Sequence, residues 1–395
     1  MLKTLKKSLN KLAFPTLSLY VHIPWCVKKC LYCDFNSHVS KSNIPEQKYI
    51  IALLEDLDKD IERYQLNQNQ YLIHSIFIGG GTPSLMSIES IKKLIIGIKR
   101  RIPFKSNIEI TIEANPNILE IERFSGYLDS GINRISIGIQ SFESKKLKYL
   151  GRTHRLEEAI YAASLAKKLN FKNVNLDLMY GLPKQNVEQA LSDLDKAIQF
   201  HPTHLSWYQL TIEPNTIFYY KKPYLPHDHI YDISQQGHDK LTKSGYTQYE
   251  ISSYSKINYQ CQHNLNYWRF GDYLGIGCGS HGKLTFENGL IIRTIKIRNP
   301  RDYLTRLNNK VQLYLSKELK VENKDKPFEF FMNRFRLIED CPKQDFTDKT
   351  KLDIKTIQNP IDWSLMEGYL TETSTHWKLT KKGQLFLNDL LIAFI

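Results

Sequence analysis

The chain has 395 residues, of which 42% are hydrophobic and 24% charged. That length allows two or three domains, and the composition is ordinary for a globular protein. It excludes a largely disordered chain, a collagen and a small disulfide scaffold. Lys and Arg number 54 against 41 Asp and Glu, a net charge of +13. This excess indicates either an acidic partner, such as nucleic acid or anionic lipid, or a compositional bias without a target.

Residues 1–16 are predicted to be an N-terminal extension. Leucines recur at helical spacing in its basic part, 1–13. Such a segment forms either a packed or frayed terminal helix or a helix lying on a membrane surface. It lacks the apolar core of a secretory signal, and the chain has no run of 18 apolar residues. We therefore expect a cytoplasmic protein without a transmembrane helix, with peripheral contact at the inner face of the membrane as the further option.

Residues 17–245 alternate between short apolar segments and amphipathic ones. The pattern predicts strands at 17–23, 73–79, 108–114, 134–140, 174–181 and 204–212, and helices at 45–64, 87–102, 119–128, 155–170 and 187–200. Strands that alternate with helices predict a parallel α/β sheet. Periodicity alone leaves open whether the sheet is doubly wound or a barrel.

The remaining chain has a different character. Residues 246–254 are a strand candidate, and 261–282 are rich in aromatic residues and glycine with few helix signals. We assign 246–326 to a connecting region. Residues 327–395 are predicted to be a smaller α+β unit, winged-helix-like, with a hairpin at 369–379 and a last helix at 381–393.

Three of the six cysteines, Cys26, Cys30 and Cys33, lie directly after the first predicted strand. Three thiolates can hold three irons of a [4Fe–4S] cluster and leave the fourth iron open to a ligand. The alternatives are a zinc site completed by His22 or His38, or chance clustering. The other cysteines lack metal-ligand spacing and are predicted to be buried thiols: Cys261, Cys278 and Cys341.

This C-x3-C-x2-C loop after the first strand resembles that of the radical S-adenosylmethionine (SAM) superfamily. The resemblance implies a partial (β/α)6 barrel with a [4Fe–4S] cluster on Cys26, Cys30 and Cys33. It also implies that SAM binds the open iron and is cleaved to a 5′-deoxyadenosyl radical.

A glycine-rich segment, 79–83, follows the second predicted strand. Its glycines let the backbone approach a ligand closely, although a tight turn has the same pattern. Polar side chains also end later strands, as they do at the active-site end of parallel barrels. Resemblance to the coproporphyrinogen-oxidase-like branch of the superfamily assigns SAM contacts to Tyr20, Tyr32, Gly80, Gly81, Thr82, Glu113, Gln140, Arg152 and Asp177.

Two features bear on the branch. The oxygen-independent coproporphyrinogen III oxidases carry a further cysteine where this chain has Phe35. The segment 263–268 has the sequence H-N-L-N-Y-W, which resembles a motif of the haem chaperones in the same branch. His263 is a candidate iron ligand, and Tyr267 and Trp268 offer flat faces for a porphyrin. The alternative is a packed aromatic turn with a capped histidine.

We therefore expect a haem chaperone that binds haem, a [4Fe–4S] cluster and SAM, and delivers haem to membrane-bound haem proteins. The alternative is an oxygen-independent coproporphyrinogen III oxidase; no catalytic residue is assigned, and the chain is a monomer or a dimer. Specific nucleic-acid binding is disfavoured because no base-reading motif accompanies the charge. The anions expected to meet the basic surface are haem propionates, the SAM carboxylate and membrane lipid.

Overall fold

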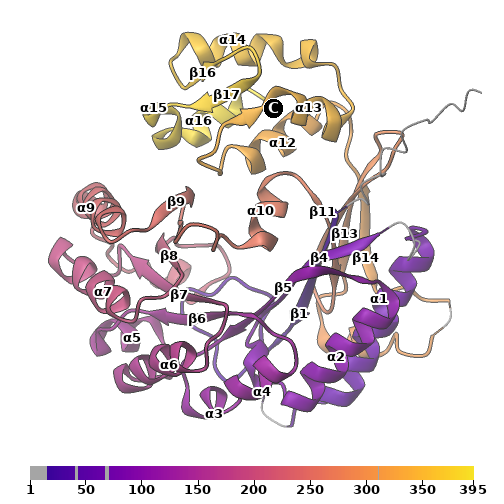
Figure 1. Cartoon of the computed structure of the whole chain (residues 1–395), viewed down its shortest axis with the longest axis vertical. Coiled ribbons are helices and arrows are strands. Elements are labelled where there is room, and N and C mark those ends of the chain that lie inside the picture. Colours follow the sequence, from indigo (N-terminus) through magenta and orange to yellow (C-terminus); the bar gives the residue numbers. More distant parts are fainter. Residues whose placement is uncertain (1–15, 41–42, 67–70, 310) are drawn as a thin grey trace, which may run out of the picture.

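The structure is a computed structural model that describes residues 16–40, 43–66, 71–309 and 311–395. The predicted helix within 1–13, and with it the possible membrane contact, lies outside the described residues. Two units are visible: a curved sheet covered by helices and a smaller unit above it (Figure 1). Within the described ranges, no helix is long and apolar enough to cross a membrane.

Six neighbouring parallel strands form the middle of the main sheet. They are β1 (Thr16–Ile23), β4 (Leu72–Gly80), β5 (Phe104–Ala114), β6 (Arg134–Gln140), β7 (Asn173–Tyr180) and β8 (His204–Gln209). All six predicted strands are confirmed, with shifts at some ends. Every residue of β6 is buried, as expected for a parallel strand covered on both faces.

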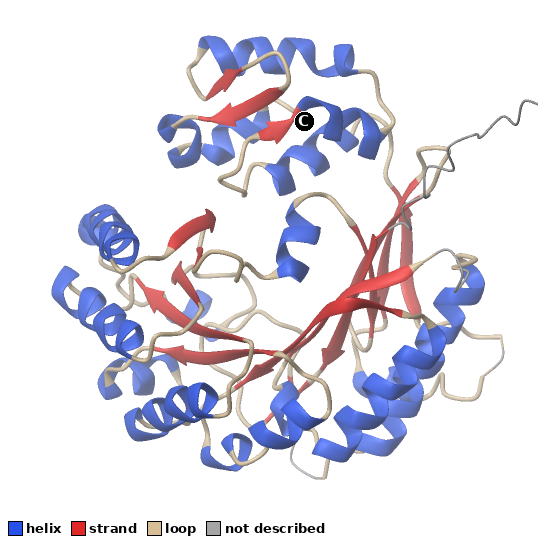
Figure 2. Cartoon of the chain, in the orientation of Figure 1, coloured by secondary structure: helices blue, strands red, loops and turns tan. Residues whose placement is uncertain are grey.

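Helices cover the convex face of this sheet (Figure 2). The helical elements of this part are α1 (Glu46–Arg63), η1 (Pro83–Leu85), α2 (Ile88–Arg101), α3 (Ile118–Ile121), α4 (Phe124–Asp129), α5 (Ser144–Leu150), α6 (Leu156–Lys168), α7 (Val187–Gln199), α8 (Ile217–Lys221), η2 (His227–His229) and α9 (Ile230–Lys243). The predicted helix 119–128 is wrong as one element. It breaks between α3 and α4, where the Arg123 guanidinium donates to the carbonyl oxygens of Ser84 and Leu85.

The main sheet continues beyond the predicted barrel segment. Strand β11 (Asp272–Ile276) pairs in parallel with β1, and three antiparallel strands extend that edge: β12 (His281–Thr285), β13 (Ile291–Lys296) and β14 (Leu315–Lys320). The predicted strand 246–254 is two antiparallel strands at the other edge, β9 (Thr247–Glu250) and β10 (Ser253–Ser255). Because β9 and β14 are separate edges, the curved sheet is an open, partial barrel.

Residues 262–268 form a helix, which the sequence analysis did not predict. This helix, α10 (Gln262–Trp268), packs against β4 and lies between the sheet and the smaller unit (Figure 1). Its first turn depends on a partner from β5, because the main-chain N–H of His263 donates to Glu109 Oε1 at 3.2 Å. The expectation of few helical residues here is therefore wrong, and the reason is a tertiary contact.

The C-terminal unit has its own aromatic core, in which Phe331 stacks on Phe346 and Phe335. Its elements are α12 (Lys326–Arg334), β15 (Cys341–Pro342), α13 (Lys343–Thr350), η3 (Ile354–Ile357), α14 (Gln358–Met366), β16 (Leu370–Glu372), β17 (His376–Leu379), α15 (Lys381–Leu385) and α16 (Leu387–Ile392). The predicted hairpin is confirmed by β16 and β17. The predicted last helix is two helices that meet at Phe386.

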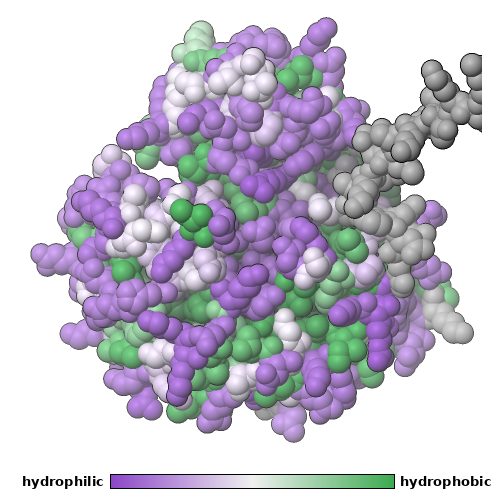
Figure 3. Space-filling view, viewed as in Figure 1, coloured by the Kyte–Doolittle hydropathy of each residue, from purple (hydrophilic) through white to green (hydrophobic). Residues whose placement is uncertain are grey.

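Three short elements complete the description: β2 (Trp25–Cys26), β3 (His38–Val39) and α11 (Pro300–Leu304). Strands β2 and β3 pair with each other and close the base of the cysteine loop. On the face drawn in Figure 3, hydrophilic residues cover most of the surface, and hydrophobic residues occur in scattered groups.

Candidate functional site

A cavity of about 690 Å³ opens at the carboxyl ends of the parallel strands. Its volume lies in the usual range for a small-molecule site. Of the residues predicted from the sequence, the lining includes Cys26, Cys30, Tyr32, Cys33, Gly80, Gly81, Thr82, Glu113, Gln140, Arg152, Asp177 and Trp268. Three predicted residues are not part of this lining: Tyr20, His263 and Tyr267.

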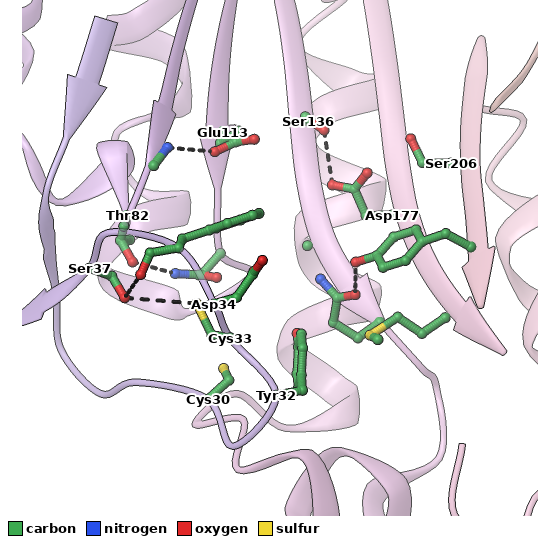
Figure 4. Close-up of a pocket in the computed structure, with 18 of the residues that line it drawn as sticks. Cys30, Tyr32, Cys33, Asp34, Ser37, Thr82, Glu113, Ser136, Asp177 and Ser206 are labelled. Carbon is green, nitrogen blue, oxygen red and sulfur yellow. Dashed lines mark hydrogen bonds between the residues drawn. The ribbon is translucent and has the colours of Figure 1, made fainter. Parts of the chain in front are cut away.

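The cysteine loop forms one wall of the cavity. All three of its cysteines are free thiols. The loop is fixed through its main chain, since Leu31 N–H donates to the Leu150 carbonyl oxygen at 3.1 Å. Figure 4 shows Cys30 and Cys33 beside Tyr32 at the cavity wall. Three thiols on one short loop can hold three irons of an iron–sulfur cluster.

The two histidines considered as zinc ligands are held by other contacts. His22 Nε2 lies 2.9 Å from the Asn36 carbonyl oxygen, and its Nδ1 lies 3.0 Å from Tyr20 Oη. His38 Nε2 lies 3.3 Å from Asn36 Oδ1. The described ranges contain no group of three His, Cys, Asp or Glu side chains placed around a single metal ion.

The glycines at the end of β4 are required by close packing. Gly80 has a φ of +118°, and a Cβ there would lie 2.6 Å from the His22 ring. A Cβ on Gly81 would lie 2.6 Å from the Trp25 carbonyl oxygen. Any larger residue would therefore push the end of β4 away from His22 of β1 and from Trp25, which directly precedes Cys26. These glycines leave the backbone exposed to the cavity, next to Thr82.

Two carboxylates line the cavity: Glu113 lies near the end of β5, and Asp177 lies within β7 (Figure 4). Glu113 Oε2 accepts a hydrogen bond of 3.0 Å from Gly80 N–H. Burial raises the pKa of Glu113 to about 7; the Gly80 hydrogen bond opposes this change and the Asp177 charge adds to it. Burial also raises the pKa of Asp177, although Ser136 and Asn175 donate hydrogen bonds to it. The pair thus favours a cationic ligand.

Arg152 supplies positive charge to the same cavity. Its guanidinium donates to Asn115 Oδ1 at 2.7 Å, to the Gly138 carbonyl oxygen at 2.8 Å and to Cys30 Sγ at 3.6 Å. Burial opposes its charge, but Tyr32 and Cys30 favour it, and the net effect raises the pKa of Arg152. A permanently charged fork therefore lies between the cysteine loop and the strand ends.

Gln140 is held in an unusual conformation. Its φ is +68°, a region that favours glycine, and Tyr208 Oη donates to its Oε1 at 2.7 Å. A strained polar residue at a strand end is typical of a functional site. Tyr208 lies in β8, and the sequence analysis gave it no role.

The other predicted residues lie outside the cavity lining. Tyr20 is held by His22, and its ring lies 6.5 Å from that of His263. His263 is buried, with Nδ1 3.1 Å from Ser75 Oγ, and burial lowers its pKa to about 3, so its ring is neutral. The Tyr267 ring contacts those of Trp268 and Tyr273. Only Trp268 of the three haem candidates faces the cavity.

The chain matches two family models, the radical SAM superfamily at residues 20–197 and the HemN C-terminal domain at residues 321–386. It is 56% identical to a protein named heme chaperone HemW of Haemophilus influenzae, over 96% of this chain and 98% of that one. The Escherichia coli HemW is 53% identical over 96% and 98%. The chain belongs to the HemW family. The Bacillus subtilis HemW is 31% identical over 96% of this chain and 99% of that one.

A solved structure of E. coli coproporphyrinogen III oxidase, HemN, has the same fold. It aligns with a TM-score of 0.80 and 20% identity, over 96% of this chain and 90% of that one. At this identity the likeness concerns the fold alone. It confirms the radical SAM fold for the HemW-family chain, together with its smaller C-terminal unit.

Membership of the radical SAM superfamily implies a [4Fe–4S] cluster and SAM. The residues of the cavity fit both groups. The cysteine loop offers thiols for iron, the carboxylates of Glu113 and Asp177 suit an ammonium group, and the Arg152 fork suits a carboxylate. SAM carries an ammonium, a sulfonium and a carboxylate, so the charges of this cavity complement it.

Although the sequence analysis named Phe35 and the segments that contain Pro83 and Asn264, it gave no ligand-binding role to the remaining lining residues. They are Lys28, Lys29, Asp34, Phe35, Ser37, Pro83, Ala114, Asn115, Ser136, Gly138, Met179, Ser206, Tyr208, Gln209, Leu210, Thr211, Glu213, Ser252, Asn264 and Arg336. Some carried a usable signal: Asn115 comes two residues after Glu113, at the same strand end, and Asn115 Nδ2 donates to Thr82 Oγ1 at 3.1 Å. Arg336 carried no such signal in the sequence, because it comes from the C-terminal unit, far along the chain from the strand ends.

Proposed function

We propose that this protein is a cytoplasmic haem chaperone that binds haem beside a [4Fe–4S] cluster and SAM, and passes the haem to membrane-bound haem proteins. The observation that carries this proposal is the similarity to proteins named heme chaperone over 96% of the chain. The H-N-x-x-Y-W segment adds support from the structure, because its helix α10 lies at the cavity and contributes Asn264 and Trp268 to the lining.

The proposal assigns the cluster to Cys26, Cys30 and Cys33. When bound, this cluster supplies electrons for reductive cleavage of SAM. The chain's own residues bind and orient: Glu113 accepts from the SAM ammonium group, and Arg152 pairs with its carboxylate. Tyr208 holds the Gln140 amide toward the cavity. Asp177, Tyr32 and the glycine segment complete the pocket around SAM.

For haem, the proposal assigns iron coordination to His263. Its imidazole is neutral, which is the form that binds a metal, and Ser75 holds Nδ1 and thereby leaves Nε2 for the iron. Because His263 is buried, this coordination requires the first turn of α10, which carries His263, to open when haem binds. Tyr267 and Trp268 lie at the other end of the same helix.

Anaerobic reconstitution followed by haem titration tests the function. We expect a saturable Soret band in wild-type protein and its loss or displacement in His263→Ala. Haem uptake that does not saturate would overturn the assignment. So would a His263→Ala protein with the same Soret band position and the same haem affinity as wild type. Incubation with coproporphyrinogen III, SAM and a reductant tests the alternative oxidase: we expect no vinyl product, in line with Phe35, and product at catalytic turnover would favour the oxidase.

A further inference from the structure

Arg336 is a cavity residue that comes from the C-terminal unit. It follows α12, and its position is fixed by its main chain, because its carbonyl oxygen accepts from Ile251 N–H at 3.1 Å. Two residues further along the chain, Ile338 N–H donates to the Tyr249 carbonyl oxygen at 3.0 Å and fixes the backbone after Arg336. The C-terminal unit is thus attached to the strand pair β9–β10 at the point where Arg336 reaches the cavity beside Trp268.

The Arg336 guanidinium is oriented but not saturated. Its carbon Cζ lies 4.4 Å from the centroid of the Trp268 ring, a cation–π contact. Nη2 lies 3.6 Å from Glu250 Oε2, which is an ion pair but too long for a hydrogen bond. The side chain is 33% exposed, and its Nε has no hydrogen-bond partner among the described residues.

A neighbouring arginine shows the contrast. Arg269, directly after Trp268, makes a two-pronged contact with Glu339, with distances of 2.8 Å and 2.6 Å. Its donors are engaged within the protein, and Arg269 is not in the cavity lining. Arg336 has the same chemistry without such a partner. A planar guanidinium that is held on an aromatic face and keeps free donors is suited to a carboxylate of a ligand.

We propose that Arg336 binds a propionate carboxylate of the tetrapyrrole, and that Trp268 is a positioning residue whose ring holds Arg336. This inference rests on the proposed haem-binding function and gives the motif's tryptophan a different task. One face of its ring is occupied by the Arg336 cation, so we assign it the task of orienting the propionate anchor and not that of stacking on the porphyrin. The C-terminal unit thereby contributes to recognition of the ligand in the cavity of the barrel.

The test compares haem with haem dimethyl ester, whose propionates carry no charge, in the same dilute detergent and with the full-length protein. Arg336→Gln is expected to weaken haem binding by about tenfold or more, the effect of one charge-assisted contact, and to leave ester binding within about twofold. Arg336→Lys, which keeps the charge and loses the fork, is expected to lie between. Arg269→Gln is the matched control and is expected to change neither affinity.

Trp268→Leu separates positioning from stacking. We expect it to weaken haem binding but not ester binding, and to add nothing in an Arg336→Gln background. Arg336→Gln alone leaves the Glu250 carboxylate without its cation, which could destabilise the fold. The double variant Glu250→Gln and Arg336→Gln removes that carboxylate as well. Thermal melts of the single and double variants therefore show whether a loss of binding comes from a loss of stability. Equal loss of both ligands in Arg336→Gln, or unchanged haem affinity, would overturn this inference alone; no haem binding by wild-type protein would overturn the proposed function with it.

Discussion

The side-chain amide nitrogen of Asn36 lies 3.0 Å from the carbonyl oxygen of Cys278 and donates a hydrogen bond to it. The same nitrogen donates to the Arg298 carbonyl oxygen, also at 3.0 Å. Gly279 leaves room for this contact, since a Cβ there would lie 2.3 Å from Asn36 Nδ2. The loop that carries Cys33 is therefore attached to the turn between β11 and β12.

Asn36→Ala should make the cluster less stable. Loss of the two hydrogen bonds frees the segment after Cys33, at a cost of about 1 kcal/mol for each bond. We expect a reconstituted Asn36→Ala protein to lose its visible cluster absorbance to a chelator about fivefold faster or more. Asn288→Ala, in a surface turn, is the control and should match wild type. Equal rates in all three proteins would show that the attachment does not protect the cluster.

The cysteines are expected to separate into two groups. Replacing Cys26, Cys30 or Cys33 by alanine should prevent assembly of an intact [4Fe–4S] cluster, because each thiolate would hold one iron. Iron and sulfide analysis with anaerobic spectra measures this directly. Cys341→Ala is the control: Cys341 is buried in the C-terminal unit and should not affect cluster content. A Cys341→Ala protein that also lacks the cluster would contradict the assignment.

Glu113 should make stability depend on pH in a defined direction. Its folded pKa is about 7, raised by burial from an ordinary value of 4.5, so the folded state holds the proton more tightly than the unfolded state does. The stability that this proton contributes is therefore fully present below the unfolded-state pKa of 4.5 and is lost as the pH rises through the folded-state pKa of about 7. Glu113→Gln removes this loss. We expect its stability advantage over wild type to grow by about 2 kcal/mol between about pH 5.5 and about pH 8.

Urea unfolding of both proteins at the two pH values measures this difference. Asp177→Asn should show the same direction of change, because burial also raises the pKa of Asp177. An advantage of Glu113→Gln that stays constant between the two pH values would mean that the Glu113 carboxyl titrates near its ordinary value.

The sequence was sufficient where a signal is local. The six parallel strands were found because each is a short apolar run between turn residues, and the cysteine loop because its spacing is specific. Three residues that the sequence analysis placed on these strands, Glu113, Gln140 and Asp177, line the cavity.

What the sequence did not predict depends on distant partners. Helix α10 needs Glu109 of β5 for its first turn, and β11 finds its place beside β1, far away in the chain. The family resemblance assigns Tyr20 a SAM contact, which stays a prediction; its hydroxyl lies 3.0 Å from His22 Nδ1, outside the cavity lining. Arg336 reaches the cavity only because the C-terminal unit docks on Ile251. No local pattern carries such information.

A buried charge cluster should dominate the stability of the sheet edge. Lys296 of β13 is 1% exposed, and its Nζ lies 2.5 Å from Asp56 Oδ1 and 2.7 Å from Asp60 Oδ1, both of α1. Lys296→Met would leave two buried carboxyl groups without their cation. We expect the free energy of unfolding to fall by about 3–5 kcal/mol near neutral pH.

Denaturant unfolding compares this variant with Lys240→Met, which removes a more exposed ion pair with Asp195 and should cost no more than about 1 kcal/mol. The deficit of Lys296→Met should shrink as the pH falls, because burial already raises the pKa of Asp60 to about 7 against the opposing effect of Lys296. Without the lysine, Asp60 binds a proton more readily, and burial of the neutral carboxyl group costs less free energy than burial of the charged one. A deficit no larger than that of Lys240→Met, or one that grows toward acid pH, would show that the cluster does not carry this stability.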